Sequence, residues 1–161
     1  MNRDKVLLPG KWVRWLFVFL FTVMAFTGFG QMPIFKRYYI ADIPGMGWSA
    51  DFFTTHIIHY LGAAIILGLF AYLAAEYALS IRRRYSLRPA GWVRVLILAG
   101  IVATGIVRVL KNLPDVTFSP GFTMFIDISH LVLMMLYLSA ALLFTLTRQG
   151  WVRDRAPARP S

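Results

Sequence analysis

Three histidines are the side chains of this sequence best suited to chemistry, and all three stand in or beside long apolar runs. His56 and His59 are three residues apart near the start of one run, and His130 is near the start of another. An unpaired imidazole inside a bilayer costs on the order of a few kcal/mol, so its presence there indicates a functional site. Neutral imidazoles also bind iron and other transition metals.

Four apolar runs predict the elements that position these histidines. The chain has 161 residues, of which 58% are hydrophobic. About twenty apolar residues, at about 1.5 Å rise each, cross a hydrocarbon core of roughly 30 Å. We therefore predict an all-α integral membrane protein, a four-helix bundle forming one membrane domain over residues 1–161. The spans are expected at about 11–32, 54–79, 91–110 and 122–147.

The sequence also predicts the start of the second span and the loop that precedes it. Residues 33–53 contain aromatic side chains and glycines, which favours an ordered loop on the membrane interface with a turn at Pro44-Gly45, although a simple connector is the alternative. Thr54 or Thr55 is the expected cap of the helix that follows.

The distribution of positive charge predicts the topology. The net charge is +10, and the lysines and arginines gather at the ends of the apolar runs, which argues for a membrane and against nucleic acid. The N-terminal arm carries four (up to Arg14), the loop around Arg82 five and the tail four, against four in the other two loops. Both termini are thus expected in the cytoplasm of a cell with an inner membrane. The histidines then lie toward the periplasm.

The cysteine count and the depth of the histidines favour one cofactor. The absence of cysteine excludes a Cys-ligated iron–sulfur cluster and a c-type haem in this chain. His59 and His130 lie roughly 8–12 Å below the outer ends of their spans, a depth at which both could bind one b-type haem iron. Gly62 would let a porphyrin approach the backbone. Arg108 and Lys111 would pair with its propionates, or else extend to the membrane interface.

Two further side chains leave alternatives open. His56 lies one turn nearer water than His59. It could replace His59 as the iron ligand, or it could bond a haem propionate or a quinone carbonyl. The remaining alternative is a histidine that simply lies at the membrane interface. Asp127, one turn before His130, either fixes the tautomer of that histidine or lies at the interface.

A short internal repeat favours two similar helical hairpins. Thr27-Gly28 closes the first span and Thr104-Gly105 lies near the end of the third. Each is followed by a loop with Pro-Gly, at Pro44-Gly45 and Pro120-Gly121, and then by an apolar run with histidine in its first turns. The repeat predicts that the second and fourth spans present their imidazoles in the same way.

With these features the chain resembles the four-helix cytochrome b subunits of membrane-bound formate dehydrogenases, nickel–iron hydrogenases and thiosulfate reductases. The resemblance rests on Arg14-Trp15 and Thr27-Gly28 in the first span, His59 with Gly62 in the second, and His130 in the fourth. It implies b-type haem and electron transfer between an extracytoplasmic iron–sulfur subunit, or another redox subunit, and quinone.

The sequence departs from that family at the inner haem. The positions of the two inner ligands fall near Phe17 and Phe144, and neither is histidine. The outer pair is kept while the inner pair is lost from both helices, which favours a single-haem variant. We therefore expect an electron-transfer subunit of a respiratory oxidoreductase complex rather than a stand-alone enzyme.

Two other classes of protein remain as alternatives. A cofactor-free membrane anchor would satisfy its histidines by hydrogen bonds between helices. A small metal or proton transporter is disfavoured, because the sequence places no acidic residue in the middle of a span.

Overall fold

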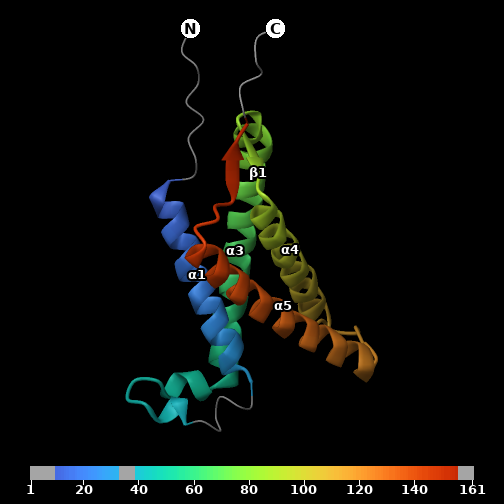
Figure 1. The fold of residues 1–161 in the computed structure, drawn as a ribbon. Coiled ribbons are helices and arrows are strands. Elements are labelled where there is room, and N and C mark those ends of the chain that lie inside the picture. The colour runs from blue at the N-terminus through green and yellow to red at the C-terminus, as the bar shows by residue number, and fades with distance from the viewer. Residues whose placement is uncertain (1–9, 33–38, 156–161) are drawn as a thin grey trace, which may run out of the picture. The chain divides into compact units, whose positions relative to one another are not determined.

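The structure, a computed structural model, describes residues 10–32 and 39–155. These residues form two compact units that divide after Arg83, and each unit is a helical hairpin with its own short connections (Figure 1). Five residues of the charge count, Arg3, Lys5, Lys36, Arg37 and Arg159, lie outside the described residues. The single four-helix bundle stays a prediction, and the two units are described one at a time.

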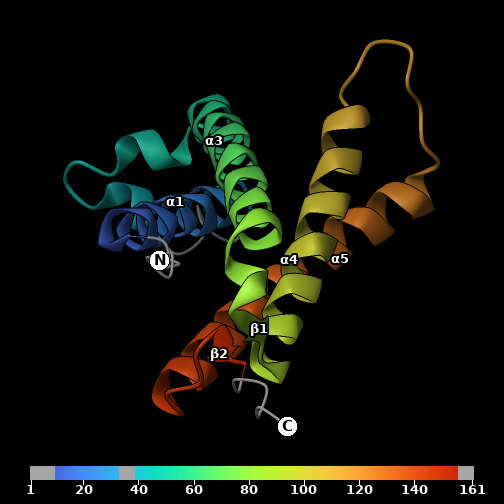
Figure 2. The ribbon, with the colours of Figure 1, turned by 90° about the horizontal axis from the view of Figure 1, so that it is seen from above.

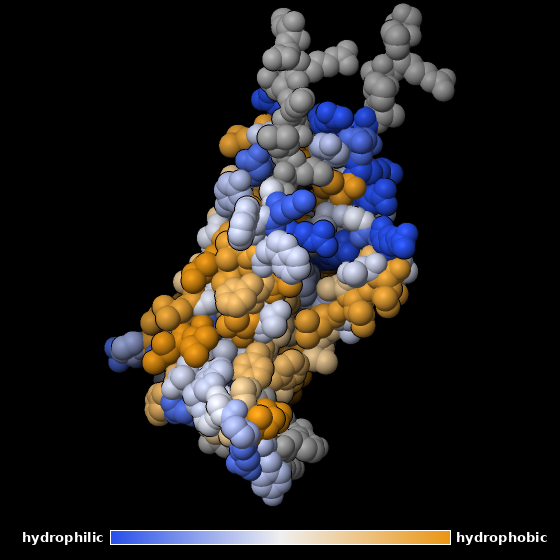
Figure 3. Space-filling view, turned by 90° about the vertical axis from the view of Figure 1, so that its left-hand side faces the viewer, coloured by the Kyte–Doolittle hydropathy of each residue, from blue (hydrophilic) through white to orange (hydrophobic). Residues whose placement is uncertain are grey.

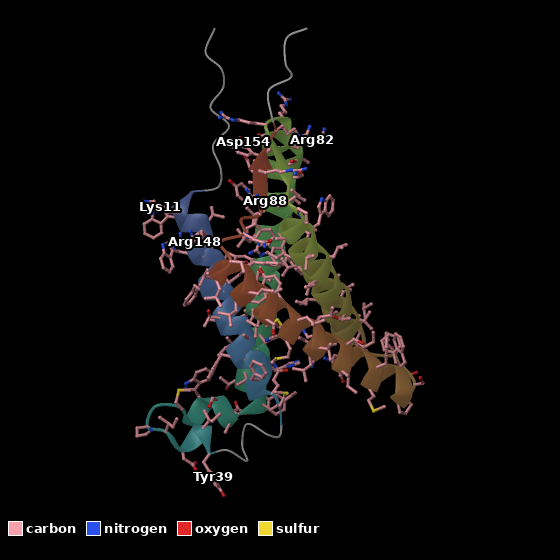
Figure 4. All side chains as sticks on the ribbon, in the orientation of Figure 1. Lys11, Tyr39, Arg82, Arg88, Arg148 and Asp154 are labelled. Atoms are coloured by element: carbon pink, nitrogen blue, oxygen red, sulfur yellow. The ribbon has the colours of Figure 1, made fainter. Side chains whose placement is uncertain are left out.

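Unit 1 is built on helices α1 (Lys11–Gly30) and α3 (Phe52–Leu79), which run antiparallel and side by side. Short 3-10 helices η1 (Ile40–Asp42), η2 (Gly47–Ala50) and η3 (Ile81–Arg83) complete it. Lys11 and Arg82 lie at one end of this unit and Tyr39 lies at the other (Figure 4). The charged end and the loop end of the hairpin are therefore opposite.

The described part of the loop between α1 and α3 is ordered, as predicted. Gly45 has φ +85°, a value that glycine adopts without strain, so the turn at Pro44-Gly45 is confirmed. The Trp48 ring lies 5.7 Å from that of Phe26, which holds the loop against α1.

The predicted cap of α3 is wrong by three or four residues. Asp51 caps the helix, with its carboxylate accepting hydrogen bonds from the backbone N–H groups of Phe53 and Thr54 at 3.3 and 3.0 Å. Its carboxylate takes two amide donors of the first turn, which is the role of an N-cap. Thr55 instead donates its hydroxyl to the Asp51 carbonyl.

Unit 2 contains α4 (Pro89–Leu110) and α5 (Pro120–Leu146), together with two strands that the all-α prediction missed. Strands β1 (Tyr85–Leu87) and β2 (Val152–Asp154) lie side by side (Figure 2). They pair antiparallel, with Ser86 opposite Arg153. This two-stranded ribbon was not predicted because each strand has only three residues, which is too few for an alternating pattern to be recognised.

Among residues 10–32 and 39–155, four helices are long and apolar enough to cross a membrane, as predicted. Their bounds lie within about two residues of those expected for the spans. Two helices begin earlier than expected because Pro89 and Pro120 occupy their first positions, where a missing N–H costs nothing. In Figure 3 the helix sides are mostly hydrophobic and the hydrophilic residues gather toward the ends of the helices. The chain thus has the character of a multi-pass membrane protein.

Candidate functional site

His59 of α3 is held by a threonine of α1. The hydroxyl oxygen of Thr27 lies 2.9 Å from Nδ1 of His59, and the Thr27 side chain is completely buried. The next residue, Gly28, leaves room for the ring, since a Cβ there would lie 3.3 Å from Cε1 of His59. Unit 1 thus fixes one edge of the imidazole between two helices.

The hydrogen bonds of Thr27 favour one tautomer of His59. The hydroxyl has a single proton, and the carbonyl oxygens of Val23 and Met24 lie 2.8 and 3.3 Å from its oxygen as acceptors. With that proton on a carbonyl, the hydroxyl oxygen is the acceptor for a proton on Nδ1 of His59. A neutral imidazole protonated at Nδ1 carries its lone pair on Nε2, which is the form that binds a metal through Nε2.

His130 of α5 has the same arrangement in unit 2. Thr104 Oγ1 lies 2.9 Å from Nδ1 of His130, and the hydroxyl donates to the Gly100 carbonyl at 2.8 Å. A Cβ at Gly105 would lie 3.4 Å from Cε1 of His130. The same argument favours the tautomer of His130 that has its lone pair on Nε2.

The Thr-Gly repeat of the sequence is therefore a repeated contact. Thr27 and His59 are 32 residues apart, and Thr104 and His130 are 26 residues apart, yet both pairs meet through the same atoms. Sequence reasoning noticed the repeat but did not assign the threonines and glycines to the histidines. The common Thr-Gly dipeptide, followed by a histidine helix, was the available signal.

One turn farther toward the loop of unit 1, His56 pairs with a neutral side chain. Its Nδ1 lies 3.2 Å from Oε1 of Gln31, while the Gln31 amide donates to the Thr27 carbonyl at 3.2 Å. The rings of Phe52 and Tyr60 lie on either side along the helix, with centroids 5.2 and 4.2 Å from the His56 ring. His56 is thus part of a mainly aromatic and uncharged layer.

The same positions in unit 2 carry ions. Gln31 follows Thr27 by four residues and Arg108 follows Thr104 by four, while His56 and Asp127 each precede their histidine by three. Arg108 Nε lies 2.9 Å from Asp127 Oδ1, and Lys111 Nζ lies 2.8 Å from Oδ2.

Two cations against one carboxylate leave an excess positive charge in this layer. Asp127 contacts the two cations, whereas Nδ1 of His130 lies within hydrogen-bond distance of Thr104. Thr104, rather than Asp127, is therefore in position to fix the tautomer of His130.

Gly62 faces α1 in unit 1. A Cβ at Gly62 would lie 2.6 Å from Sδ of Met24, so the glycine admits that side chain between the helices. This contact gives Gly62 a packing role, and the expected approach of a porphyrin stays a prediction. In unit 2 the small residue stands on the other helix, where Gly100 receives Leu133, with a Cβ distance of 3.0 Å.

Phenylalanine rings occupy the two positions that correspond to the inner haem ligands of the family that this chain resembles. The ring of Phe17 lies 5.5 Å from Phe21 and 6.1 Å from Phe70 of α3. Phe144 packs under the guanidinium of Arg94 at 4.7 Å. These positions are filled by contacts within each hairpin.

The described residues offer single imidazoles and no protein-only metal centre. Within residues 10–32 and 39–155, no group of three or more His, Cys, Asp or Glu side chains is placed to hold a metal ion. A cofactor that brings four of its own ligands, such as a porphyrin, needs only one or two axial imidazoles. The tautomers favoured for His59 and His130 fit that requirement.

No protein-family model, curated protein or solved structure matches this chain.

Proposed function

We propose that this chain is a membrane cytochrome b subunit that binds one b-type haem through Nε2 of His59 and Nε2 of His130. The observation that carries the proposal is the repeated threonine–histidine contact, which favours the tautomer with its lone pair on Nε2 in both imidazoles. Two hairpins that prepare their histidines in the same way suit a cofactor with two equivalent axial positions. When bound, the haem supplies reversible one-electron transfer.

The residues around the two histidines would serve binding and positioning. Thr27 and Thr104 orient the rings and keep Nδ1 protonated, as carboxylates or carbonyls do for other metal-bound histidines. Arg108 and Lys111 exceed Asp127 by one positive charge, which favours the carboxylates of haem propionates at that end of α4.

A single haem is favoured over two. Phe17 and Phe144 stand at the two positions where the family that this chain resembles has the histidine ligands of its inner haem, and both rings are packed against neighbouring side chains. The electron path of this chain would then lie near one side of the membrane. By the charge distribution that side is the periplasmic one.

The partners follow from that location. An extracytoplasmic redox subunit, as in the resembling family, would exchange electrons with the haem, and quinone or quinol would be the second partner. His56, with its aromatic neighbours Phe52 and Tyr60, is the candidate for the quinone side. The chain would act as the electron-transfer subunit of a respiratory complex in the inner membrane.

The test is a dithionite-reduced minus oxidised absorption spectrum of the purified chain, expressed in a haem-producing host, together with its haem-to-chain ratio. We expect a b-type spectrum and one haem per chain. Absence of a reducible chromophore in a folded, helical preparation would overturn the proposal.

A cofactor-free membrane anchor is the second candidate, and one observation favours it. All three histidines already have a hydrogen-bond partner on the neighbouring helix, namely Thr27, Gln31 and Thr104. Such bonds satisfy a polar group in hydrocarbon without any cofactor. The same spectrum separates the two functions, because an anchor has no visible absorption.

A further inference from the structure

A basic ribbon extends from the end of unit 2 opposite the Arg108 layer. Strand β1 ends two residues before α4 begins, and β2 follows shortly after α5. The pairing continues beyond the strands, because Arg88 N–H donates to the Trp151 carbonyl and Arg155 N–H donates to the Arg84 carbonyl, both at 2.9 Å. The ribbon thus begins directly at the end of a membrane-spanning helix.

The two faces of the ribbon differ in character. Leu87 and Val152 are opposite each other and partly buried, and Leu87 Cδ2 lies 3.3 Å from the position of a Cβ at Gly91 in α4. Ser86 and Arg153 are opposite each other on the other face, where Arg153 Nε donates to Ser86 Oγ at 3.3 Å. Because side chains alternate along a strand, Arg155 shares the face of Arg153.

A buried arginine attaches the C-terminal side of the ribbon to α4. Arg94 is only 5% exposed, and its Nη2 donates to the Gln149 carbonyl at 3.0 Å. Its guanidinium lies 4.7 Å from the ring centre of Phe144 and 5.0 Å from that of Trp151. Cation–π contacts of this kind are stabilising when they are shielded from water. Arg153 of β2 and Arg155 just after it are therefore carried on an anchored segment.

The charge of this region is strongly unbalanced. In the described residues from 84 to 88 and from 148 to 155 there is one acidic side chain, Asp154, which forms an exposed ion pair with Arg84 at 3.6 Å. The basic side chains of these segments are Arg84, Arg88, Arg148, Arg153 and Arg155. Arg88 and Asp154 lie at the ribbon, and Arg148 lies at the end of α5 (Figure 4).

We propose that the Arg153 face of this ribbon is a binding surface for the headgroups of anionic phospholipids. Arginine pairs well with phosphate, and polybasic segments next to a membrane-spanning helix are attracted to anionic lipids within about a Debye length. The apolar face of Leu87 and Val152 packs toward α4, so the basic face is the one presented outward. This inference is independent of the haem.

The test compares lipid binding by native mass spectrometry of the full chain in detergent with equimolar phosphatidylglycerol and phosphatidylcholine. We expect the wild-type chain to retain phosphatidylglycerol at least threefold over phosphatidylcholine. Arg153→Gln with Arg155→Gln should reduce this preference to less than twofold, whereas replacement of both by lysine should retain most of it.

The matched control removes two charges from a different element, with Lys11→Gln and Arg14→Gln in the first turn of α1. This control should keep the wild-type preference. If the control loses as much preference as the ribbon variant, general positive charge explains the binding and the proposal is overturned. An unchanged preference in the ribbon variant, with the fold intact by circular dichroism, would overturn it as well.

A second variant tests the ribbon without removing charge. A Cβ at Gly91 would collide with the backbone carbonyl of Trp151, so Gly91→Ala displaces the ribbon from α4 while all the arginines remain. We expect the preference for phosphatidylglycerol to fall at least twofold. An undiminished preference would show that the ordered ribbon is not what selects the lipid.

Discussion

The two hairpins share one layer and differ in the next. In both, a threonine near the end of the first helix bonds Nδ1 of a histidine in the second, and the following glycine makes room for the ring. One turn farther toward the loop, unit 1 has the neutral pair of Gln31 and His56. Unit 2 has two cations on Asp127 at the corresponding positions.

The common layer holds the two proposed axial ligands, and the layer that differs lies beside them. In the proposed cytochrome b, both axial histidines need the same tautomer. The outer layer has no such requirement, so one unit carries aromatic and amide groups and the other carries ions. The same freedom appears in the packing, where the small residue lies on α3 in unit 1 and on α4 in unit 2.

We expect the largest loss of stability from a larger side chain at Gly62, where α3 approaches α1 closely. Gly62→Val should cost about 2–3 kcal/mol in the free energy of unfolding, because its side chain meets Met24. The measurement is denaturant unfolding in mixed micelles. Gly68→Val is the matched control, since nothing lies within 4 Å of a Cβ at Gly68 on the same helix.

Rescue sharpens this prediction. Met24→Ala should recover at least half of the loss caused by Gly62→Val, because it empties the space that the valine enters. A loss of the same size in the control, or no rescue, would show that the Gly62–Met24 contact does not set the spacing of α1 and α3.

The charged layer should be more sensitive than the neutral one. Asp127→Asn leaves Arg108 and Lys111 without their shared carboxylate, and we expect a loss of about 1–2 kcal/mol, reduced by partial exposure to solvent. His56→Ala removes a neutral pair and should cost about 0.5 kcal/mol. Equal losses in the same unfolding experiment would contradict the distinction drawn between the two layers.

The threonines should have a small effect on stability and the clearest effect in spectroscopy. Thr27→Val or Thr104→Val removes the partner of Nδ1 and should cost about 1 kcal/mol each. Nitrogen NMR of the apoprotein should show the Nδ1-protonated tautomer of His59 and His130 in the wild type and in the serine variants. A mixture of tautomers is expected in the valine variants, and an Nε2-protonated wild type would refute the assignment.

The sequence predicted the helices well because each depends on a long local pattern. Twenty or more apolar residues identify a span without knowledge of its neighbours, and the Pro-Gly turn at Pro44-Gly45 is likewise local. The cap at Asp51 was misassigned because three nearby polar residues, Asp51, Thr54 and Thr55, compete for that role. The choice between them depends on backbone dihedral angles, which the sequence does not specify.

The contacts of the site were less accessible to prediction because they depend on the register between helices. The sequence placed His59 and His130 as candidates, but whether Thr27 or another residue faces His59 depends on how α1 and α3 pack. Asp127 was noted from the sequence for its position before His130, while its pairing with Arg108 and Lys111 required the geometry of α4 and α5. The ribbon joins segments on either side of that hairpin, which no local pattern reveals.

The haem content of three histidine variants tests the central claim most directly. The account predicts one haem per chain in the wild type, none in His59→Ala or His130→Ala, and one in His56→Ala. Haem lost from His56→Ala but kept in His59→Ala would contradict the assigned ligand pair, and no haem in the wild type would leave the membrane anchor.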